Sequence, residues 1–213
     1  MTIDFTPSGS VEIPEIPYQE RVELPADRTA VLVVDMQNDF VKPEGTLEVP
    51  AAQETIPHIQ QLLGLARQHR VRIAYTQDTG AENDPEFDIW PEHCVRGTWG
   101  WRIIEELKPH EDDVVFWKNR YDGFYGTALD HYLTRLWKID HLVIVGTVSN
   151  ICVAHTAASA GLRWFDVVMP ANGISALTTF DQALTLRQVS SLYNGSVVRS
   201  TGRIHFEIAG EGS

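Results

Sequence analysis

Three residues have side chains that could carry out acyl-transfer chemistry, and each closely follows a short apolar run. Asp35 ends the first such run, Lys118 ends a later one, and Cys152 lies six residues after the glycine of a third. A cysteine attacks as its thiolate, a nearby ammonium stabilises that anion, and a carboxylate can take up and return a proton. These residue types are suited to hydrolysis through a covalent thioester.

The residues around Cys152 predict an acidic thiol and a place for a developing oxyanion. The apolar run before Cys152 predicts a strand and the residues after it predict a helix, and a helix N-terminus lowers the pKa of a thiol. Lys118 would add a second positive charge, and Asp35 would accept the thiol proton. The sequence GTVSN just before the cysteine offers backbone N–H groups that could hold an oxyanion.

Each of the three residues also has a purely structural interpretation. An isolated cysteine such as Cys152 is often a buried packing residue. Asp35 could belong to a turn or a helix cap, and Lys118 could simply end a strand in solvent. Their shared position at strand ends favours the chemical interpretation over three separate structural ones.

Six short runs rich in β-branched residues predict the strands that must position these side chains. The runs alternate with amphipathic stretches, which indicates a parallel sheet covered on both faces. We therefore predict an α/β fold, a three-layer α/β/α sandwich with a mostly parallel six-stranded sheet. In such sheets ligands bind outside the carboxyl ends of the strands. The predicted strands are 29–35, 71–78, 113–118, 141–147, 166–170 and 196–201.

Helical spacing of apolar residues predicts three buried helix faces between these strands. The three faces are Ile56, Ile59, Leu62, Leu63 and Ala66; Leu129, Tyr132, Leu133 and Leu136; and Leu184, Leu186, Val189 and Leu192.

The length and composition predict one domain. A chain of 213 residues with 43% hydrophobic content can bury a single sizeable core, which we place at residues 29–208. Residues 1–28 are rich in Pro and Glu and lack periodicity, so we expect an extended N-terminal arm, either mobile or lying against a neighbouring subunit of a homo-oligomer. The irregular stretch 78–100 is long enough to form a pocket wall or lid.

The charge and cysteine content exclude several classes of partner. A net charge of -12 argues against a nucleic-acid or anionic-membrane surface, because phosphate binding needs clustered Lys and Arg. The two cysteines do not form a disulfide framework, and no signal peptide, membrane span or nucleotide-binding motif is present in the sequence. We expect a cytoplasmic protein without a cofactor that acts on a small molecule.

Three stretches, VLVVDMQNDFV, FWKNRYDGFYGT and GTVSNICVAHTAASAG, resemble the isochorismatase-like cysteine hydrolase superfamily. That superfamily includes nicotinamidases, carbamoylsarcosine amidases, and ureidoacrylate or biuret hydrolases. The resemblance implies that Asp35, Lys118 and Cys152 form a catalytic triad. It also implies a cis peptide between Thr147 and Val148, with the Val148 and Cys152 amides as the oxyanion hole. True isochorismatases lack this cysteine, which favours an amide substrate here.

The lid sequence WPEHCVRGTWG resembles the substrate wall of nicotinamidases. By that resemblance Trp90 and Phe40 would flank a flat substrate, and His93 would match a metal ligand. Metal-binding nicotinamidases carry Asp-x-His at the end of the second strand, whereas here Asp78 is followed by Thr79 and Gly80. Two assured ligands are too few for a metal site, so we predict no bound metal, although Asp84, Glu86 or Asp88 could in principle complete a site.

The expected function is therefore hydrolysis of the C–N bond of a small linear amide. A nicotinamide-like carboxamide is placed slightly ahead, because Phe40 and Trp90 favour a planar substrate. The alternatives are a ureido or carbamoyl amide of the biuret, carbamoylsarcosine or ureidoacrylate type, and a catalytically idle member that acts as a binding or scaffold protein.

Overall fold

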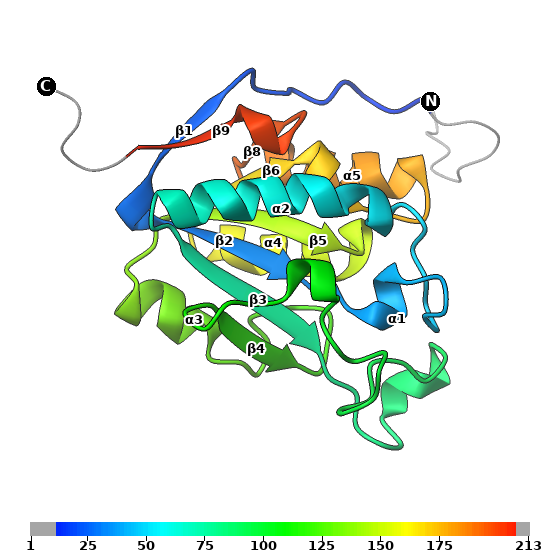
Figure 1. Cartoon of the computed structure of the whole chain (residues 1–213). Helices are drawn as coiled ribbons and strands as arrows, with labels where there is room; N and C mark the ends of the chain where they lie inside the picture. Colours follow the sequence, from blue (N-terminus) through cyan, green and yellow to red (C-terminus); the bar gives the residue numbers. More distant parts are fainter. Residues whose placement is uncertain (1–11, 208–213) are drawn as a thin grey trace, which may run out of the picture.

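The computed structural model describes residues 12–207. Its main sheet has the strand order β4-β3-β2-β5-β6-β8, with every pair of neighbours parallel (Figure 1). Each of the six predicted strands is present, and the last ends three residues earlier than predicted. Their bounds are β2 Thr29–Val34, β3 Arg72–Asp78, β4 Val114–Lys118, β5 His141–Thr147, β6 Asp166–Pro170 and β8 Ser196–Val198.

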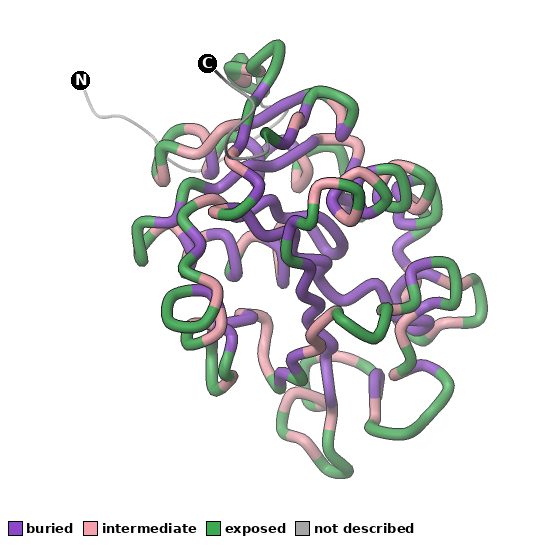
Figure 2. The backbone as a smooth tube through the Cα atoms, turned by 60° about the vertical axis from the view of Figure 1, so that its left-hand side comes forward, coloured by how far each residue is buried: buried purple, intermediate pink, exposed green. Residues whose placement is uncertain are grey.

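Helices cover both faces of this sheet, so the predicted three-layer α/β/α sandwich is confirmed. The alternating side chains of β2 explain why both faces are covered: Val31 and Val33 enter one apolar core, and Leu32 enters the other. Figure 2 shows the buried backbone running through the middle of the molecule. The helices are α1 Asn38–Val41, α2 Ala52–Gln68, α3 Leu129–His131, α4 Ala154–Leu162 and α5 Thr179–Leu192.

The predicted face of α2 is correct, whereas the other two predicted faces each include at least one leucine that is exposed. On α2, Ile59, Leu62, Leu63 and Ala66 are all buried as predicted, because their spacing keeps them on one face. On α5, by contrast, Leu184 and Leu192 are exposed. Ala183, Leu186 and Val189 form the buried row of α5, and Leu184 is rotated by about 100° from that row.

The second predicted face also ends in an error. Leu129 and Leu133 are buried, but Leu136 is 55% exposed. Residues 132–136 form a π-helical turn instead of a continued α-helix, which changes the side-chain rotation per residue. The α-helical period therefore does not hold at Leu136.

Three short strands lie outside the predicted set. β7, Ile174–Ser175, adds a seventh strand to the main sheet by pairing with β5. β1, Val22–Pro25, pairs in parallel with β9, Ile204–Glu207, in a separate two-stranded sheet. None of the three shows a long apolar run, which is the signal that identified the other strands.

The described part of the predicted N-terminal arm, from residue 12 on, contacts the rest of the same chain. Tyr18 packs on the core, with the Arg199 guanidinium 4.3 Å from the centre of its ring, and Gln19 forms a bridge with Val198. β1 then joins the arm to β9. Residues 1–11 of the predicted arm, and residues 208–213 at the other end, lie outside the described residues.

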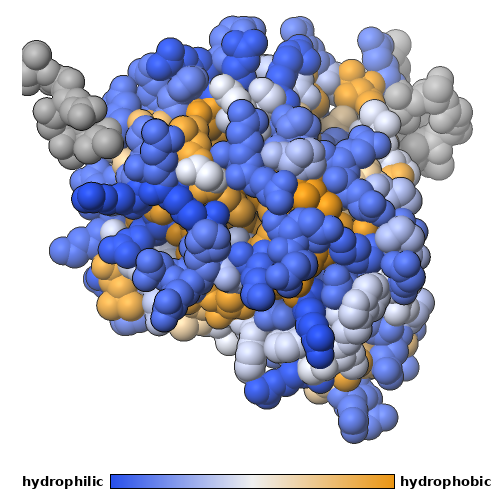
Figure 3. Space-filling view, in the orientation of Figure 1, coloured by the Kyte–Doolittle hydropathy of each residue, from blue (hydrophilic) through white to orange (hydrophobic). Residues whose placement is uncertain are grey.

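Polar residues dominate the face of the molecule seen in Figure 3, with apolar patches between them. In the described part of the chain, no helix combines the length and the apolar character needed to span a membrane.

Candidate functional site

Asp35 is the first residue after β2 and lies at the carboxyl edge of the sheet. Its φ of 49° turns the chain away from the strand direction, and its N–H donates to the Thr76 carbonyl at 3.2 Å. The Thr76 hydroxyl donates to Asp35 Oδ1 at 2.7 Å. Both the backbone and the side chain of Asp35 are thus fixed by β3.

Lys118 is the last residue of β4 and its side chain is completely buried. Its ammonium Nζ lies 2.7 Å from Asp35 Oδ2, 3.2 Å from Asp78 Oδ1 and 3.6 Å from Cys152 Sγ. A buried ammonium is costly unless opposite charges surround it, and here two carboxylates do so. The structure therefore brings Asp35, Lys118 and Cys152 together at the predicted edge of the sheet.

Cys152 lies in a π-helical turn, residues 149–153, which leads directly into α4. The Thr147–Val148 peptide bond before this turn is cis, as the resemblance implied. Ser149 Oγ donates to Gln182 Oε1 at 2.6 Å, which ties the turn to α5. The roles of the Val148 and Cys152 amides as an oxyanion hole remain a prediction.

One glycine explains how β5 reaches this turn. Gly146 has a φ of 122°, and a Cβ at that position would lie 2.1 Å from the Val34 carbonyl oxygen. Only glycine accommodates both the backbone conformation and this close approach between β5 and β2. Gly146 therefore allows the Cys152 turn to begin beside the end of β2, where Asp35 follows.

The charges around Lys118 determine how the site titrates. Burial raises the pKa of Asp35, although Lys118 opposes that shift. Burial lowers the pKa of Lys118, but Asp35 and the other anionic neighbours outweigh it and hold that pKa well above its ordinary value. Lys118 is therefore an ammonium, and Asp35 is a stronger base than an exposed aspartate.

The expectation of an acidic Cys152 is wrong for the resting site. Burial raises the pKa of Cys152 well above its ordinary value, and Lys118 lowers it only in part, because Asp35 and Asp78 raise it further. The helix-terminus rule overlooks the desolvation of a buried thiol. Cys152 rests as a thiol, so attack requires a base that removes its proton.

Asp78 is a fourth member of the charged cluster, and the sequence identified it only as a possible metal ligand. It is the last residue of β3, directly opposite Lys118 in the strand register. Its Oδ2 lies 3.4 Å from Nε2 of His93, which belongs to the predicted lid, residues 78–100. Burial raises the pKa of Asp78, but Lys118 and His93 lower it to a value below the ordinary one. Asp78 thus connects Lys118 to the lid as a carboxylate.

His93 also makes a second contact that bears on metal binding. Its Nδ1 faces the Pro91 carbonyl at 2.8 Å, so that nitrogen is a donor. The described residues contain no group of three or more His, Cys, Asp or Glu side chains arranged to hold a metal ion. The absence of a bound metal in the active protein remains a prediction.

Cys152 opens onto a cavity of about 110 Å³, much smaller than the pockets that hold drug-sized ligands. Phe40 from α1 and Trp90 from the lid both line it, and Trp90 Nε1 donates to the Tyr121 hydroxyl at 2.8 Å. Their predicted contact with a substrate stays a prediction. The lining residues are Phe40, Leu47, Glu48, Val49, Asp78, Glu86, Trp90, His93, Tyr121, Val148, Ile151, Cys152 and Leu177.

Two residues that fix the lid were not identified from the sequence. The Gln37 amide donates to the carbonyls of Asp78 and Trp101, each at 2.8 Å. Asp39 accepts the Cys94 N–H at 2.7 Å, and it leaves so little room that a Cβ on Gly100 would lie about 2.1 Å from its carboxylate. The available signal in the sequence was the run of polar residues, Gln37 to Asp39, soon after the end of the first strand. The structure shows that all three are buried.

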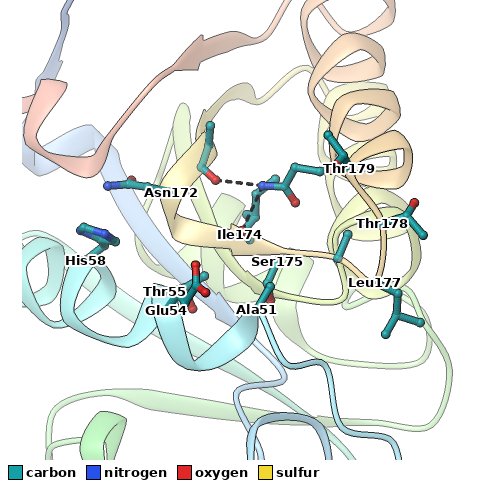
Figure 4. A pocket seen from close by; sticks show the side chains of 13 residues that line it. Ala51, Glu54, Thr55, His58, Asn172, Ile174, Ser175, Leu177, Thr178 and Thr179 are labelled. Carbon is teal, nitrogen blue, oxygen red and sulfur yellow. Dashed lines mark hydrogen bonds between the residues drawn. The ribbon is translucent and has the colours of Figure 1, made fainter. Parts of the chain in front are cut away.

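A larger hollow of about 410 Å³ (Figure 4) has Leu177 in its lining, a residue that also lines the cavity at Cys152. It lies between the first turns of α2, which supply Glu54 and His58, and the segment 171–179 that leads into α5. Its lining contains no cysteine, whereas Cys152 lines the smaller cavity. The hollow therefore lacks the thiol that distinguishes the smaller cavity.

The isochorismatase domain family matches residues 29–202 of this chain. Ureidoacrylate amidohydrolase RutB from Caulobacter segnis is 30% identical over 222 residues, covering 91% of this chain and 92% of that protein. The fold also resembles an isochorismatase-like hydrolase from Alkaliphilus metalliredigens, with a TM-score of 0.77, 32% identity, and coverage of 82% of this chain and 96% of that one. N-carbamoylsarcosine amidase from Thermoplasma acidophilum has a TM-score of 0.73, 32% identity, and coverage of 81% and 96%. With the family match, the relatives and the sheet-edge site all in agreement, the chain belongs to the isochorismatase family, the isochorismatase-like hydrolases.

Proposed function

We propose that this protein is a cysteine-dependent amidohydrolase that cleaves the C–N bond of a small linear amide. The observation that carries the proposal is the position of Lys118 Nζ, 2.7 Å from Asp35 Oδ2 and 3.6 Å from Cys152 Sγ beside a small cavity. A nucleophile, a base and a fixed positive charge are the three elements that amide hydrolysis through a thioester requires.

In the first step Asp35 removes the proton from Cys152, and the sulfur bonds to the amide carbonyl carbon. Burial raises the pKa of Asp35, which makes Asp35 a stronger base for this proton transfer. The charge that forms on sulfur and then on the carbonyl oxygen lies near Lys118. The Val148 and Cys152 N–H groups are the proposed donors to that oxygen.

In the second step the tetrahedral intermediate collapses. The C–N bond breaks, Asp35 returns its proton to the leaving nitrogen, and ammonia or a small amine departs. The acyl group remains on Cys152 as a thioester. Asp35, again a carboxylate, then deprotonates a water molecule that attacks the thioester carbon, and the protonated Asp35 returns a proton to Cys152.

The ureido or carbamoyl alternative is the better supported substrate type. The relative from Caulobacter segnis is named a ureidoacrylate amidohydrolase, and the similar structure from Thermoplasma acidophilum is named an N-carbamoylsarcosine amidase. The preference for nicotinamide rested on Phe40 and Trp90. Both line the cavity, but Trp90 donates to Tyr121 and Phe40 lies beside His93, with ring centres 5.7 Å apart.

The test is a parallel measurement of ammonia release from nicotinamide, biuret, N-carbamoylsarcosine and ureidoacrylate. We expect turnover of at least one ureido or carbamoyl compound, with an S-carbamoyl adduct on Cys152, the thiocarbamate counterpart of the thioester, visible by mass spectrometry after rapid acid quenching. Activity confined to nicotinamide would reinstate the nicotinamide-like preference. An unreactive Cys152 with no turnover of any amide would instead favour an idle binding protein.

A further inference from the structure

We propose that the cavity at Cys152 selects uncharged or cationic amides whose N–H groups face Glu86. The same cavity would disfavour amides that carry a carboxylate. This inference rests on the proposed amidohydrolase function and narrows its substrate class. The described residues that line the cavity include Glu48, Asp78 and Glu86 but neither Arg nor Lys. A substrate carboxylate would therefore enter a cavity lined by anions.

Glu86 is the best placed of these anions to contact a substrate. It lies in the short helical segment Pro85–Asp88 of the lid, where its N–H donates to Asp84 Oδ1 at 2.9 Å, and its side chain is only 10% exposed. Burial, and next Asp78, raise the pKa of Glu86. His93, Arg120 and Lys118 oppose this shift, but the ion pair with Arg120 is long, at 3.5 Å. A buried carboxylate held by one long ion pair still gains from a neighbouring N–H donor or positive charge.

The cationic groups near the cavity are already occupied. Lys118 is held between Asp35 and Asp78. Arg120 Nη1 is shared between Asp84, at 3.2 Å, and Glu86, at 3.5 Å; its side chain is 42% exposed and does not line the cavity.

His93 is likewise occupied at both ring nitrogens. Nδ1 donates to the Pro91 carbonyl and Nε2 faces Asp78. The two ends of the chain outside the described residues, 1–11 and 208–213, contain no Lys or Arg in their sequences. Among the described residues at the cavity, no cation is therefore left over for a substrate carboxylate.

This charge distribution bears on the substrate after which one relative is named. Ureidoacrylate, the compound in that relative's name, combines a ureido group with a carboxylate. The cavity described here can accommodate the ureido part through Cys152 and Glu86, whereas the carboxylate would meet Glu48 or Glu86. We infer that the two proteins share the reacting group of their substrates and differ in the substituent attached to it.

The first experiment measures the charge selectivity of the cavity without any substrate. Cys152 is alkylated with iodoacetamide or iodoacetate, which are similar in size and differ in charge, and the modified peptide is quantified by mass spectrometry. Glutathione under the same conditions supplies the intrinsic ratio of the two rates. We expect the preference of Cys152 for iodoacetamide to exceed that ratio by about tenfold or more.

Three variants assign this selectivity to Glu86. Glu86→Gln should reduce the excess preference several-fold, and Glu86→Lys should remove or reverse it. Glu82→Gln, the same charge change at an exposed lid position outside the cavity lining, should leave it unchanged. A Cys152 preference no larger than that of glutathione, or one unaffected by both Glu86 variants, would overturn the inference.

The second experiment uses three ureas with the same reacting group: 3-ureidopropionate, N-propylurea and N-(2-aminoethyl)urea. We expect kcat/KM for the neutral and cationic compounds to exceed that for the carboxylate by about tenfold, with the difference shrinking in Glu86→Gln. Fastest hydrolysis of 3-ureidopropionate would refute the charge selection but leave the amidohydrolase function intact. Charge-selective alkylation without hydrolysis of any amide would refute the function and support the selection.

Discussion

The two cysteines occupy neighbouring regions of the molecule that differ in charge. Cys94 in the lid is completely buried, and its Sγ lies 4.0 Å from the Gly100 carbonyl. Burial, followed by the carboxylates Asp78, Asp39 and Asp35, raises the pKa of Cys94 far above its ordinary value. Cys152 is nearly as buried and is also a thiol at rest, but it has the Lys118 ammonium within 3.6 Å and opens onto a cavity.

This comparison shows that burial alone does not make a thiol reactive. Burial disfavours the thiolate at both positions. Only Cys152 combines a nearby ammonium, a basic carboxylate and space for a substrate. We therefore expect changes to these neighbours to affect the two cysteines very differently.

The largest expected difference is between Cys152→Ala and Cys94→Ala. Cys152→Ala should abolish amide turnover while leaving the fold intact, because no other described nucleophile lies beside Lys118. Cys94→Ala should keep wild-type kcat and lose about 1 kcal/mol of unfolding free energy through looser lid packing. Ammonia release and urea unfolding measure the two effects. Substantial turnover by Cys152→Ala would remove it as the nucleophile.

Asp35→Asn should lower kcat by about a thousandfold or more. An amide can neither accept the thiol proton nor deliver one to the leaving nitrogen, and Cys152 does not ionise unaided at neutral pH. The Thr76 hydroxyl can still donate to the oxygen of the new side-chain amide, so folding should persist. Alkylation of Cys152 by iodoacetamide should slow as well, whereas Cys94 should be unaffected. Wild-type alkylation rates in Asp35→Asn would show that the thiol has another base.

Much of this site was predictable because the sheet itself carries it. Asp35, Lys118 and Cys152 follow or end apolar strands, and parallel strands place their carboxyl ends at one edge. The lid contacts were not predictable, because Asp78, His93 and Gln37 meet across long stretches of chain through side-chain geometry alone. The pKa of Cys152 was predicted in the wrong direction for a related reason: sequence position indicates a helix end but not how completely the thiol is enclosed.

The limits of the fold prediction have a similar cause. Long apolar runs identified the six strands of the main sheet, whereas the two residues of β7 and the polar ends of β1 and β9 depend on tertiary pairing. The exposed Leu136 depends on a π-helical turn that periodicity does not reveal.

Lys118→Ala should reduce kcat by about a hundredfold or more and should also destabilise the protein by roughly 3–5 kcal/mol, since it leaves Asp35 and Asp78 buried without their cation. The double variant Lys118→Ala/Asp78→Asn separates these effects. It should recover part of the stability, because one uncompensated carboxylate is gone, but little of the activity. Urea unfolding and steady-state kinetics test this, and wild-type turnover by Lys118→Ala would reduce the lysine to a structural role.

Trp90→Ala should have a smaller effect, about tenfold on kcat/KM, because Trp90 forms part of the cavity wall but takes no part in the proposed proton transfers or bond formation. Tyr121→Phe is the matched control, since it removes only the hydroxyl that accepts the Trp90 N–H. It should cost a few-fold at most. The comparison of nicotinamide with biuret sharpens the result: a loss confined to nicotinamide would favour an aromatic guest stacked on Trp90, and an equal loss for both would indicate a general role in closing the cavity.

The smallest expected effect concerns the contact of His93 with Asp78, the carboxylate that raises the pKa of both cysteines. Burial lowers the pKa of His93, but its contact with Asp78 raises it to a net value above the ordinary 6.5. A raised histidine pKa contributes stability that is complete below the ordinary value and is lost as pH rises through the folded-state value. Asp78 stays ionised throughout, since its own pKa is lowered.

The stability advantage of wild type over His93→Gln should therefore be largest in mild acid and shrink above neutrality. Urea midpoints of both proteins from about pH 5 to about pH 9 measure this. A difference that stays constant over that range would mean that the protonation of His93 does not change against Asp78, and that Lys118 is the cation that compensates this carboxylate.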